Sequence, residues 1–542
     1  MVFVAEPLTS MPQVGIWHYV FSNPNNISLD KPLMIDGITG NHLTYGQVKS
    51  NSLRFRAGLH KFGFKKGDAL CLFSQNKVDY AVVMFGTVAA GGALTPANPA
   101  YTAKELQYQL EQTKSKIVIA SAETLAVALE AAKLAGIPKS NVFLFDDREI
   151  DGVQPYTKVL LADQEMEAVE YTYEEACSTI AYLCFSSGTT GRSKGVMTSH
   201  MNIASNLTQL SQHTKGTVDV ATDRYLGVLP FYHIYGLTCM IHLAAFQGTP
   251  LVVLPRFELA SFLNAIATHR VTFCHIVPPI FILLAKDPSV TKYDLSCVRY
   301  FWSGAAPLSK ELSEAVAQRL NVGVLQGYGM TESSPVSHTP ILSNIINGSI
   351  GELLPGMKAR IVDESGKDVA PGERGELWMA GPNIMLGYLN MPDATAETID
   401  KDGYLHTGDV AIMTEDKQWY IVDRVKELIK YKGFQVAPAE LEALLLTYEN
   451  VADCAIIGVY DPSQATELPR AYIKLVLGVE ASDATAKAII DSVAKSVANH
   501  KKLRGGVRFI AEIPKSAAGK ILRKELRELA NQEMKASVQS KI

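Results

Sequence analysis

The stretch that decides the fold of this 542-residue chain is SSGTTGRSKG at residues 186–195. An apolar run at 179–185 comes directly before it and predicts a strand, and a helical pattern at 201–210 follows it. Glycines allow a backbone to approach a polyphosphate closely, hydroxyl groups add hydrogen-bond donors, and a lysine adds positive charge. The stretch therefore predicts a phosphate-binding loop between a strand and a helix. The residues expected to contact phosphate are Ser186, Ser187, Gly188, Thr189, Thr190, Gly191 and Lys194.

Two other interpretations of this loop are weaker. A surface turn rich in Gly and Ser would explain the glycines, but not so dense a series of donors between a strand and a helix. The nucleotide-binding loop GxxxxGK[ST] does not fit either, because Lys194 is preceded by Ser193 and followed by Gly195.

Short apolar runs rich in β-branched residues alternate with amphipathic patterns through the first four-fifths of the chain. Such an alternation is typical of parallel sheets covered by helices, so an α/β fold is expected. Strands are expected at 69–73, 117–120, 142–145, 251–254, 271–277 and 298–302, and helices at 103–112, 124–134 and 310–319.

The pattern changes after this region. Alternating residues separated by turns predict a small antiparallel unit at 351–380. A mixed α+β tail follows Asp423, and from residue 424 on it carries 19 Lys and Arg against 14 Asp and Glu. A basic tail on an acidic body suits polyanionic substrates, although a solvated basic face would look the same. Helices are expected in the tail at 439–446, 484–498 and 522–530.

The composition argues against several classes of protein. The seven cysteines are scattered without a CxxC pair or a Cys/His cluster, which indicates reduced thiols rather than disulfides or a zinc site. A pI of about 6.3 and the absence of a dense Lys/Arg stripe argue against nucleic-acid binding. The longest apolar stretch, 80–94, is interrupted by glycines and is shorter than the roughly 20 residues of a membrane span. No amino-terminal signal peptide is expected either.

Six further motifs follow the loop in order: FYHIYG at 231–236, SGAAPLS at 303–309, QGYGMTE at 326–332, HTGD at 406–409, VDRVKELIKYKGFQVAP at 422–438 and PKSAAGKILRK at 514–524. With the loop, they resemble the signatures of the AMP-forming adenylating enzymes, which include acyl-CoA synthetases, peptide-synthetase adenylation domains and beetle luciferases. The resemblance implies a large amino-terminal domain (1–422) of helix-covered, mostly parallel sheets plus a small β-barrel-like unit. It also implies a hinge (423–426) and a small, mobile α+β carboxyl-terminal lid domain (427–542).

The resemblance implies a reaction in two steps. A carboxylic acid and ATP give an acyl-adenylate and pyrophosphate, and CoA then displaces AMP to give acyl-CoA. In the first step Thr331 would contact the α-phosphate and Glu332 would bind Mg²⁺, because a hard cation prefers oxygen ligands. Lys520 resembles the mobile lysine that bridges the carboxylate and the α-phosphate. The other residues expected at the nucleotide are Ala305, Ala306, Gln326, Gly327, Tyr328, Asp409 and Arg424.

The second step in such enzymes follows a rotation of the lid domain. Lys426 matches the hinge position, and Arg256 matches a basic position that meets the CoA nucleotide. His233 would move aside to open the path of the thiol. After the rotation Lys430 and Gln435 would face the adenylate, and Lys432 and Gly433 would line the path of the pantetheine arm.

The motifs around the acid pocket are most similar to those of 4-coumarate:CoA ligases and their aryl or medium-chain relatives. Gly236 and the pair Ser333–Ser334 depart from the usual pattern of these ligases. The motifs therefore do not indicate which substituents the aromatic ring of the acid carries. Two alternatives remain: a luciferase-like oxygenase that adenylates its acid, and a non-catalytic sensor of acyl-CoA or AMP. The residues expected to line the pocket are His233, Tyr235, Gly304, Gly329, Pro335 and Val336.

The chain ends in Ser540, Lys541 and Ile542. This tripeptide is similar to the Ser-Lys-Leu address read by the peroxisomal import receptor, with isoleucine in the last place. A peroxisomal location is therefore expected, with the cytoplasm as the alternative.

Overall fold

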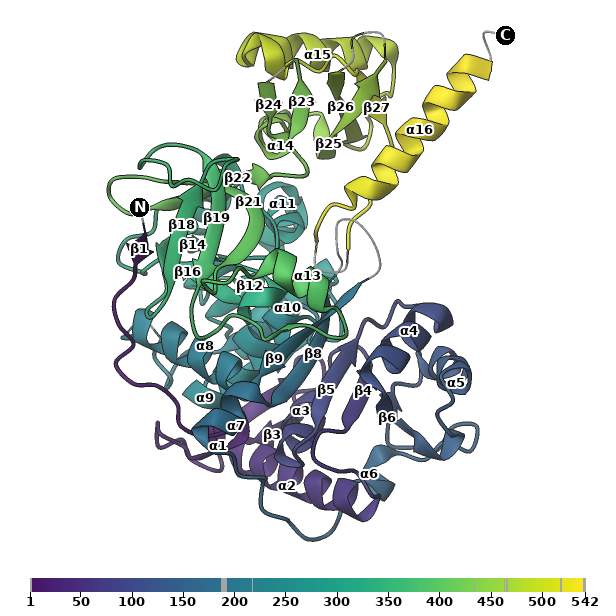
Figure 1. Ribbon diagram of the computed structural model, residues 1–542. Helices are drawn as coiled ribbons and strands as arrows, with labels where there is room; N and C mark the ends of the chain where they lie inside the picture. The colour runs from purple at the N-terminus through teal and green to yellow at the C-terminus, as the bar shows by residue number, and fades with distance from the viewer. Residues whose placement is uncertain are drawn as a thin grey trace.

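The computed structural model describes residues 2–186, 193–216, 218–432, 434–462, 464, 466–516 and 519–539. Figure 1 shows a large body that is continuous from the amino terminus to the green strands, and a smaller yellow-green domain above it. The predicted residues Ser187, Gly188, Thr189, Thr190, Gly191 and Gly433, and the terminal residues Ser540, Lys541 and Ile542, lie outside the described ranges.

Ser186 and Lys194, at the two ends of the predicted phosphate loop, lie on β8 and β9 of a seven-stranded sheet with the order β20-β9-β8-β5-β4-β6-β7. The expected helix therefore comes only after a further strand, β9. The strands from β8 to β7 are parallel, whereas β9 is antiparallel to β8 and β20 is antiparallel to β9. Their bounds are β4 (Ala69–Phe73), β5 (Ala93–Ala97), β6 (Ser115–Ala120), β7 (Val142–Leu144), β8 (Ile180–Ser186), β9 (Lys194–Ser199) and β20 (Gly387–Tyr388).

A second seven-stranded sheet has the order β14-β13-β12-β10-β11-β2-β3 and is parallel except for the β2–β3 pair. The two sheets confirm the α/β prediction. The bounds are β2 (Pro32–Asp36), β3 (His42–Thr44), β10 (Tyr225–Gly227), β11 (Leu251–Val253), β12 (Phe273–Ile276), β13 (Tyr300–Ser303) and β14 (Gly323–Gln326).

Helices cover these sheets, and several begin at a sequence-encoded cap: Thr44, Thr102, Thr172 and Ser199 each form a reciprocal capping box. Every residue of α3 is buried, so the first two-thirds of the apolar stretch at 80–94 forms a core helix, and its end enters β5. No helix in the described ranges is long and apolar enough to cross a membrane. The helices of the body are α1 (Ile16–Phe21), α2 (Tyr45–Lys61), α3 (Tyr80–Ala89), α4 (Ala103–Thr113), α5 (Leu125–Leu134), η1 (Lys139–Asn141), α6 (Tyr156–Val159), α7 (Tyr173–Ser178), α8 (His200–His213), η2 (Gly236–His242), α9 (Leu243–Gln247), α10 (Leu259–His269), α11 (Pro278–Lys286), η3 (Pro288–Lys292), α12 (Lys310–Leu320), η4 (Thr331–Ser333) and α13 (Pro392–Thr398).

The antiparallel part of the body is larger than the predicted unit at 351–380. Its five strands, in the order β1-β18-β19-β21-β22, continue to Arg424, because β21 pairs with β19 and β22 pairs with β21. Their bounds are β1 (Phe3–Val4), β18 (Lys358–Val362), β19 (Gly375–Ala380), β21 (Leu405–Met413) and β22 (Trp419–Arg424), and a smaller sheet contains β15 (Tyr328–Gly329), β16 (Val336–Thr339) and β17 (Glu352–Leu353).

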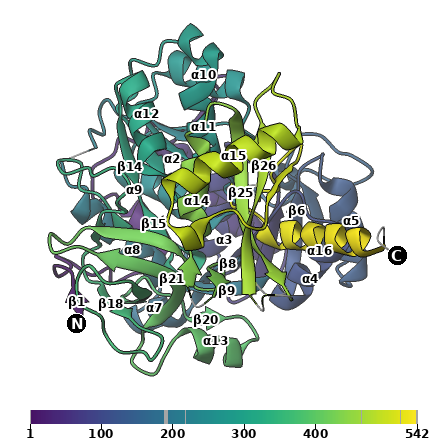
Figure 2. The ribbon, with the colours of Figure 1, turned by 90° about the horizontal axis from the view of Figure 1, so that it is seen from above.

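The carboxyl-terminal domain lies over the body, and α16 extends away from it toward the carboxyl terminus (Figures 1 and 2). The Asp423 carboxylate accepts a 3.0 Å hydrogen bond from the Ala439 N–H at the start of α14. Lys286 of α11 donates to the carbonyl oxygens of Leu446 and Val451 at 3.1 and 2.8 Å, which ties the end of α14 to the body. The domain contains β23 (Ile429–Tyr431), β24 (Phe434–Val436), α14 (Pro438–Leu446), β25 (Val451–Asp461), β26 (Thr466–Leu475), α15 (Asp483–Ser496), η5 (Asn499–Lys501), β27 (Val507–Phe509) and α16 (Arg523–Gln539).

Candidate active site

The end of β8 and the start of β9 bring a lysine close to a carboxylate. Ser186 and Lys194 are opposite partners on the two strands. Lys194 Nζ lies 4.4 Å from the centre of the Tyr388 ring, and the Tyr388 hydroxyl donates a 2.9 Å hydrogen bond to Glu332 Oε1. The Ser186 hydroxyl donates to the same oxygen at 3.2 Å. Tyr388 therefore connects the predicted phosphate-binding lysine with the predicted metal-binding carboxylate.

Glu332 is well suited to a hard cation. Its side chain is buried, next to the buried Thr331 in η4. Both hydrogen bonds that it accepts from described residues reach Oε1, which leaves Oε2 for a ligand. In the part of the chain that the structure describes, no cluster of three or more His, Cys, Asp or Glu side chains could hold a metal ion. Mg²⁺ in phosphate sites commonly takes one or two carboxylates and completes its shell with phosphate oxygens, and Glu332 fits that arrangement.

A second group of contacts surrounds the buried carboxylate of Asp409. The Tyr328 hydroxyl donates to Asp409 Oδ2 at 2.5 Å, and Arg424 Nε lies 3.1 Å from Asp409 Oδ1. Burial, with the Asp409 charge adding to it, raises the pKa of Tyr328, so the phenol stays protonated and donates. Asp409 and Arg424 are register partners on β21 and β22, which explains their ion pair. Three residues predicted at the nucleoside thus form one connected group.

A tight turn before α16 presents Lys520. The Ser516 N–H donates to the Lys520 carbonyl oxygen at 2.8 Å, and the Lys520 N–H donates back to Ser516 Oγ at 3.2 Å. Gly519 has a φ of +78°, and a Cβ there would lie 3.1 Å from the Val277 side chain of the body. Glycine therefore allows this turn of the small domain to pack closely against the large one.

The surroundings of Lys520 show where its side chain lies. Burial, followed by the positive charge of Arg424, lowers the pKa of Lys520 to about 8, against the opposing effect of Asp409, Glu427 and Glu332. Lys520 is thus within electrostatic reach of both the Asp409 group and the Glu332 group. The structure brings this lysine of the small domain into the site of the large one.

Next to these groups lies a cavity of about 50 Å³. All six residues predicted for the acid pocket line it. Burial, with the Lys520 charge adding to it, lowers the pKa of His233 to about 4, so His233 is neutral at pH 7. The lining residues are His233, Ile234, Tyr235, Trp302, Ser303, Gly304, Ala305, Gly327, Tyr328, Gly329, Met330, Pro335 and Val336.

Glycines keep this cavity open. A Cβ on Gly304 would lie 3.0 Å from the Tyr235 ring, and one on Gly329 would lie 2.0 Å from the Pro335 carbonyl oxygen. A side chain at Gly304 would press on Tyr235, and one at Gly329 would collide with backbone. Any residue larger than glycine would therefore reshape the pocket wall.

The loop after β13 is held by Gln326. Gln326 Oε1 accepts from the Leu308 N–H, and its Nε2 donates to the Gly348 carbonyl oxygen at 3.3 Å, so this amide is engaged within the chain. The Ala306 N–H donates to the Gly304 carbonyl oxygen at 2.9 Å. Ala305 has a φ of +67° and lines the pocket.

The other predicted site residues lie elsewhere. In this domain arrangement their side chains are exposed, and none of them lines the cavity or contacts Asp409 or Glu332. Gln435 Nε2, on the β23–β24 hairpin, donates to Glu364 of the body at 3.0 Å. The group comprises Arg256, Lys426, Lys430, Lys432 and Gln435.

Three residues at the site were not identified from the sequence. Tyr388 bonds to Glu332 across 56 positions. Trp302 forms part of the pocket wall and stacks on His275, with ring centres 5.2 Å apart. His275 in turn bonds to the Tyr235 hydroxyl at 3.1 Å. Trp302 stands directly before the SGAAPLS motif, and that position was the one available signal.

Comparisons with known proteins agree with this geometry. The AMP-binding enzyme family matches residues 22–389, and the AMP-binding enzyme C-terminal domain matches residues 440–520. A probable 4-coumarate–CoA ligase 1 of Dictyostelium discoideum is 38% identical over 540 residues, which cover 96% of this chain and 95% of the relative. The 4-coumarate–CoA ligase 3 of Arabidopsis thaliana is 37% identical over 520 residues, covering 94% and 90% of the two chains.

Among solved structures, ATP-bound MatB from Rhodopseudomonas palustris superposes with a TM-score of 0.84 at 28% identity, over 95% of this chain and 98% of that one. The fold, the Lys520 site and the two matched domains lead to one conclusion. This chain belongs to the AMP-binding enzyme family and is an AMP-forming acid:CoA ligase that uses ATP and CoA.

Proposed function

We propose that the acid activated by this ligase is an aryl-alkenoic acid similar to 4-coumarate, an aryl-acetic acid or a medium-chain fatty acid. The observation that carries the proposal is the pocket beside Lys520, whose walls include the aromatic rings of Tyr235 and Trp302. Its described lining contains no Asp, Glu, Lys or Arg, so a flat ring or an alkyl chain suits it. The names of the two relatives above support the aryl-alkenoic class.

In the proposed first step, a carboxylate oxygen attacks the α-phosphorus of ATP and pyrophosphate leaves. Two anions must approach each other, so fixed positive charge and donors lower the barrier. Lys520 holds the acid carboxylate and the α-phosphate together, and Thr331 donates to the α-phosphate. Asp409 accepts from the ribose hydroxyls while Arg424 holds its carboxylate. Mg²⁺ bound at Glu332 would offset the charge of the phosphates.

In the proposed second step, the small domain rotates, and the CoA sulfur attacks the acyl carbon as AMP leaves. Lys430, Lys432 and Gln435 are exposed and lie outside the site, whereas Lys520 is within it. This arrangement supports adenylation before the rotation and thioester formation after it. Lys426, exposed in the turn after β22, is the proposed pivot. The rotation must break the Lys286 and Asp423 contacts described above.

The test is turnover with a panel of acids: 4-coumaric, phenylacetic and the straight-chain series from hexanoic to hexadecanoic acid. Purified enzyme with ATP and Mg²⁺ is assayed with and without CoA, and AMP, pyrophosphate and thioester are measured by mass spectrometry. We expect thioester and AMP in equal amounts with at least one aryl or medium-chain acid. Adenylate without thioester would point to the oxygenase alternative, and no turnover with any acid would overturn the proposal.

Tyr388→Phe is expected to raise the Mg²⁺ concentration needed for half-maximal pyrophosphate release by about 10-fold, the effect of losing one hydrogen bond to a charged group. The phenyl ring still faces Lys194, so the variant removes the hydroxyl contact to Glu332 alone. The measurement is the initial rate across a Mg²⁺ titration. An unchanged Mg²⁺ requirement would show that Tyr388 does not position Glu332.

We also propose import into peroxisomes through Ser540, Lys541 and Ile542. The support is the similarity of this tripeptide to the Ser-Lys-Leu address. A fluorescent fusion at the amino end is expected to collect in peroxisomes and to spread through the cytoplasm when the three residues are removed. An identical distribution of the two fusions would refute the proposal.

A further inference from the structure

Helix α11 of the body contacts the small domain at both of its ends. At its start, a Cβ on Gly519 would lie 3.1 Å from the Val277 side chain. At its end, Lys286 Nζ donates to two carbonyl oxygens of the small domain at 3.1 and 2.8 Å. A helix of nine residues is about 13 Å long, so the two contacts are well separated. The first contact is one residue away from Lys520 in the chain.

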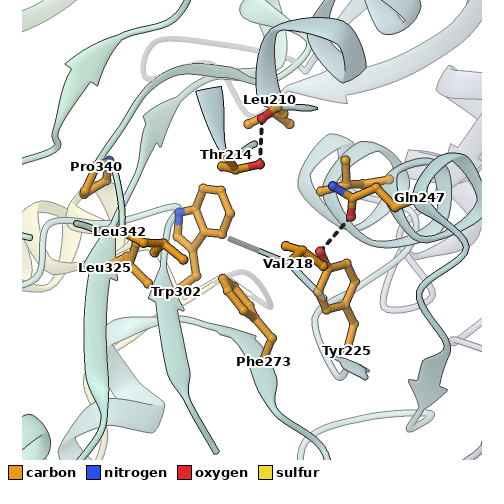
Figure 3. Close-up of a pocket in the computed structure, with 11 residues that line it drawn as sticks. Leu210, Thr214, Val218, Tyr225, Gln247, Phe273, Trp302, Leu325, Pro340 and Leu342 are labelled. Carbon is orange, nitrogen blue, oxygen red and sulfur yellow. Dashed lines mark hydrogen bonds between the residues drawn. The ribbon is translucent and has the colours of Figure 1, made fainter. Parts of the chain in front are cut away.

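The core of the body holds α11 in place. The helix begins just after β12, and Phe273 of that strand packs against Trp302 and Tyr225, with ring centres 5.7 and 5.6 Å away (Figure 3). The cavity left among the residues drawn in Figure 3 is about 10 Å³, which is no more than the room for one water. Phe281 of α11 is fully buried and packs against Phe301 of β13, with ring centres 6.1 Å apart. A helix packed in this way moves with its sheet, so it offers the small domain a fixed surface.

Lys286 binds the end of a helix of the small domain. The two carbonyl groups that it contacts belong to Leu446, the last residue of α14, and Val451, the first residue of β25. The last carbonyl groups of a helix have no partner within the helix and carry partial negative charge, so an ammonium group stabilises them. Partial burial lowers the pKa of Lys286, against the opposing effect of Cys454 and Asp453. Asp453 of β25 is therefore within electrostatic reach of the ammonium group.

Asp453 connects the surroundings of Lys286 with the turn that carries Lys520. Its carboxylate forms a 2.6 Å ion pair with Lys515 Nζ. Lys515 and Ile521 are bridge partners on the two sides of that turn. The turn is thus tied to α11 by two routes, directly at the start of the helix and through β25 at its end.

We propose that Lys286 is a positioning residue for adenylation, which seats the small domain on α11 and so holds Lys520 in the site while the acyl-adenylate forms. The proposal rests on the proposed function, because it takes Lys520 as the lysine of the first step. Rotation about Lys426 has to break both hydrogen bonds of Lys286. These bonds therefore favour the first step and oppose the change to the second.

The test is Lys286→Met, which removes the ammonium group and keeps the length of the side chain. Single-turnover release of pyrophosphate is expected to slow by about 10-fold, the effect of losing one hydrogen bond from a charged group. Thioester formation from a synthetic acyl-adenylate and CoA is expected to be at least as fast as in wild type, because the bonds of Lys286 are already broken in that step. Lys286→Arg keeps the positive charge and the donors and is expected to restore pyrophosphate release.

Two further variants make the test specific. Lys292→Met removes an exposed lysine of η3, six positions later in the chain, and is expected to leave both half-reactions unchanged. Asp453→Asn weakens the ion pair with Lys515 and is expected to slow pyrophosphate release without slowing thioester formation. If Lys286→Met does not fold, Asp453→Asn still carries the test.

Equal losses in both half-reactions of Lys286→Met, or a rate of pyrophosphate release equal to that of Lys292→Met, would overturn the inference. The proposed function fails in a different way: the wild-type enzyme turns over none of the acids, or Lys520→Ala releases pyrophosphate as fast as wild type. If Lys520→Ala is slow in the first step and Lys286→Met is not, only the role of Lys286 fails.

Discussion

Lys520→Ala is expected to slow acyl-adenylate formation by about 10²-fold or more, the cost of removing one fixed charge or donor from a developing oxyanion. The charges of Asp409 and Glu332 act on Lys520, which stands next to Gly519 in a turn packed against Val277. Its loss removes the cation that offsets repulsion between the acid and the α-phosphate. Single-turnover release of pyrophosphate measures this step directly.

The second half-reaction is the internal control for this variant. Thioester formation from a synthetic acyl-adenylate and CoA is expected to remain within a few-fold of wild type, because Lys520 acts before the domain rotates. Lys524→Ala removes an exposed lysine four positions away and is expected to leave both steps unchanged. Equal losses in both half-reactions would indicate that Lys520 stabilises the structure of the small domain and has no specific role in adenylation.

The lowered pKa of Lys520 predicts that the rate of pyrophosphate release depends on pH. Its pKa is lowered to about 8, so the charged form is present below that pH and is lost as pH rises through it. The kcat/KM of pyrophosphate release is expected to fall above pH of about 8, since this parameter reports groups of the free enzyme. Lys520→Arg keeps its charge over that range and is expected to remove the alkaline decline. An alkaline decline that persists in the arginine variant would assign it to another group.

Asp409→Ala is expected to raise the KM for ATP by about 100-fold. Two ribose hydroxyls would each lose a hydrogen bond to a charged acceptor, at about 1.5–3 kcal/mol each. The change also leaves Arg424 and the Tyr328 hydroxyl without their shared partner. Initial rates across an ATP titration give the effect, and the KM for the acid is expected to change much less.

Glu376 offers a matched control for Asp409. Its carboxylate accepts a 3.0 Å hydrogen bond from the Gly408 N–H and therefore holds the same turn without facing the nucleoside group. Glu376→Ala is expected to lower thermal stability slightly and to leave the KM for ATP near its wild-type value. A comparable rise in both variants would mean that the shape of the turn, rather than the Asp409 carboxylate, governs ATP binding.

Much of the fold follows from local sequence patterns. The strand at 69–73 has the predicted bounds, and the helices at 103–113 and 310–320 extend one residue beyond their predictions. Ser and Thr caps and apolar periodicity act within a few residues, so a single sequence displays them. The antiparallel sheet was underestimated because β21 joins it by pairing with β19, about 30 residues earlier in the chain, and β22 then pairs with β21. Pairing with a strand so distant leaves no local mark in the sequence.

In the site, too, local motifs could be recognised from the sequence, whereas contacts between distant residues could not. Motif residues such as Glu332 and Asp409 were identified because their neighbours in sequence carry the signature. Tyr388 and His275 could not be identified, because their roles arise from contacts with residues distant in the chain. Trp302 has a partly local signal, but its place in the pocket wall, stacked on His275, depends on how β12 and β13 pair.

The position of Trp302 also has a spectroscopic consequence. The chain has four tryptophans, Trp17, Trp302, Trp378 and Trp419, and all of them belong to the large body. Only Trp302 among them lines the described acid pocket, where it stacks on a histidine. A change in intrinsic fluorescence when the acid enters the pocket is therefore expected to come from Trp302 alone. The small domain contributes no tryptophan emission. We expect binding of the acid to change the emission of Trp302, because this indole lines the pocket.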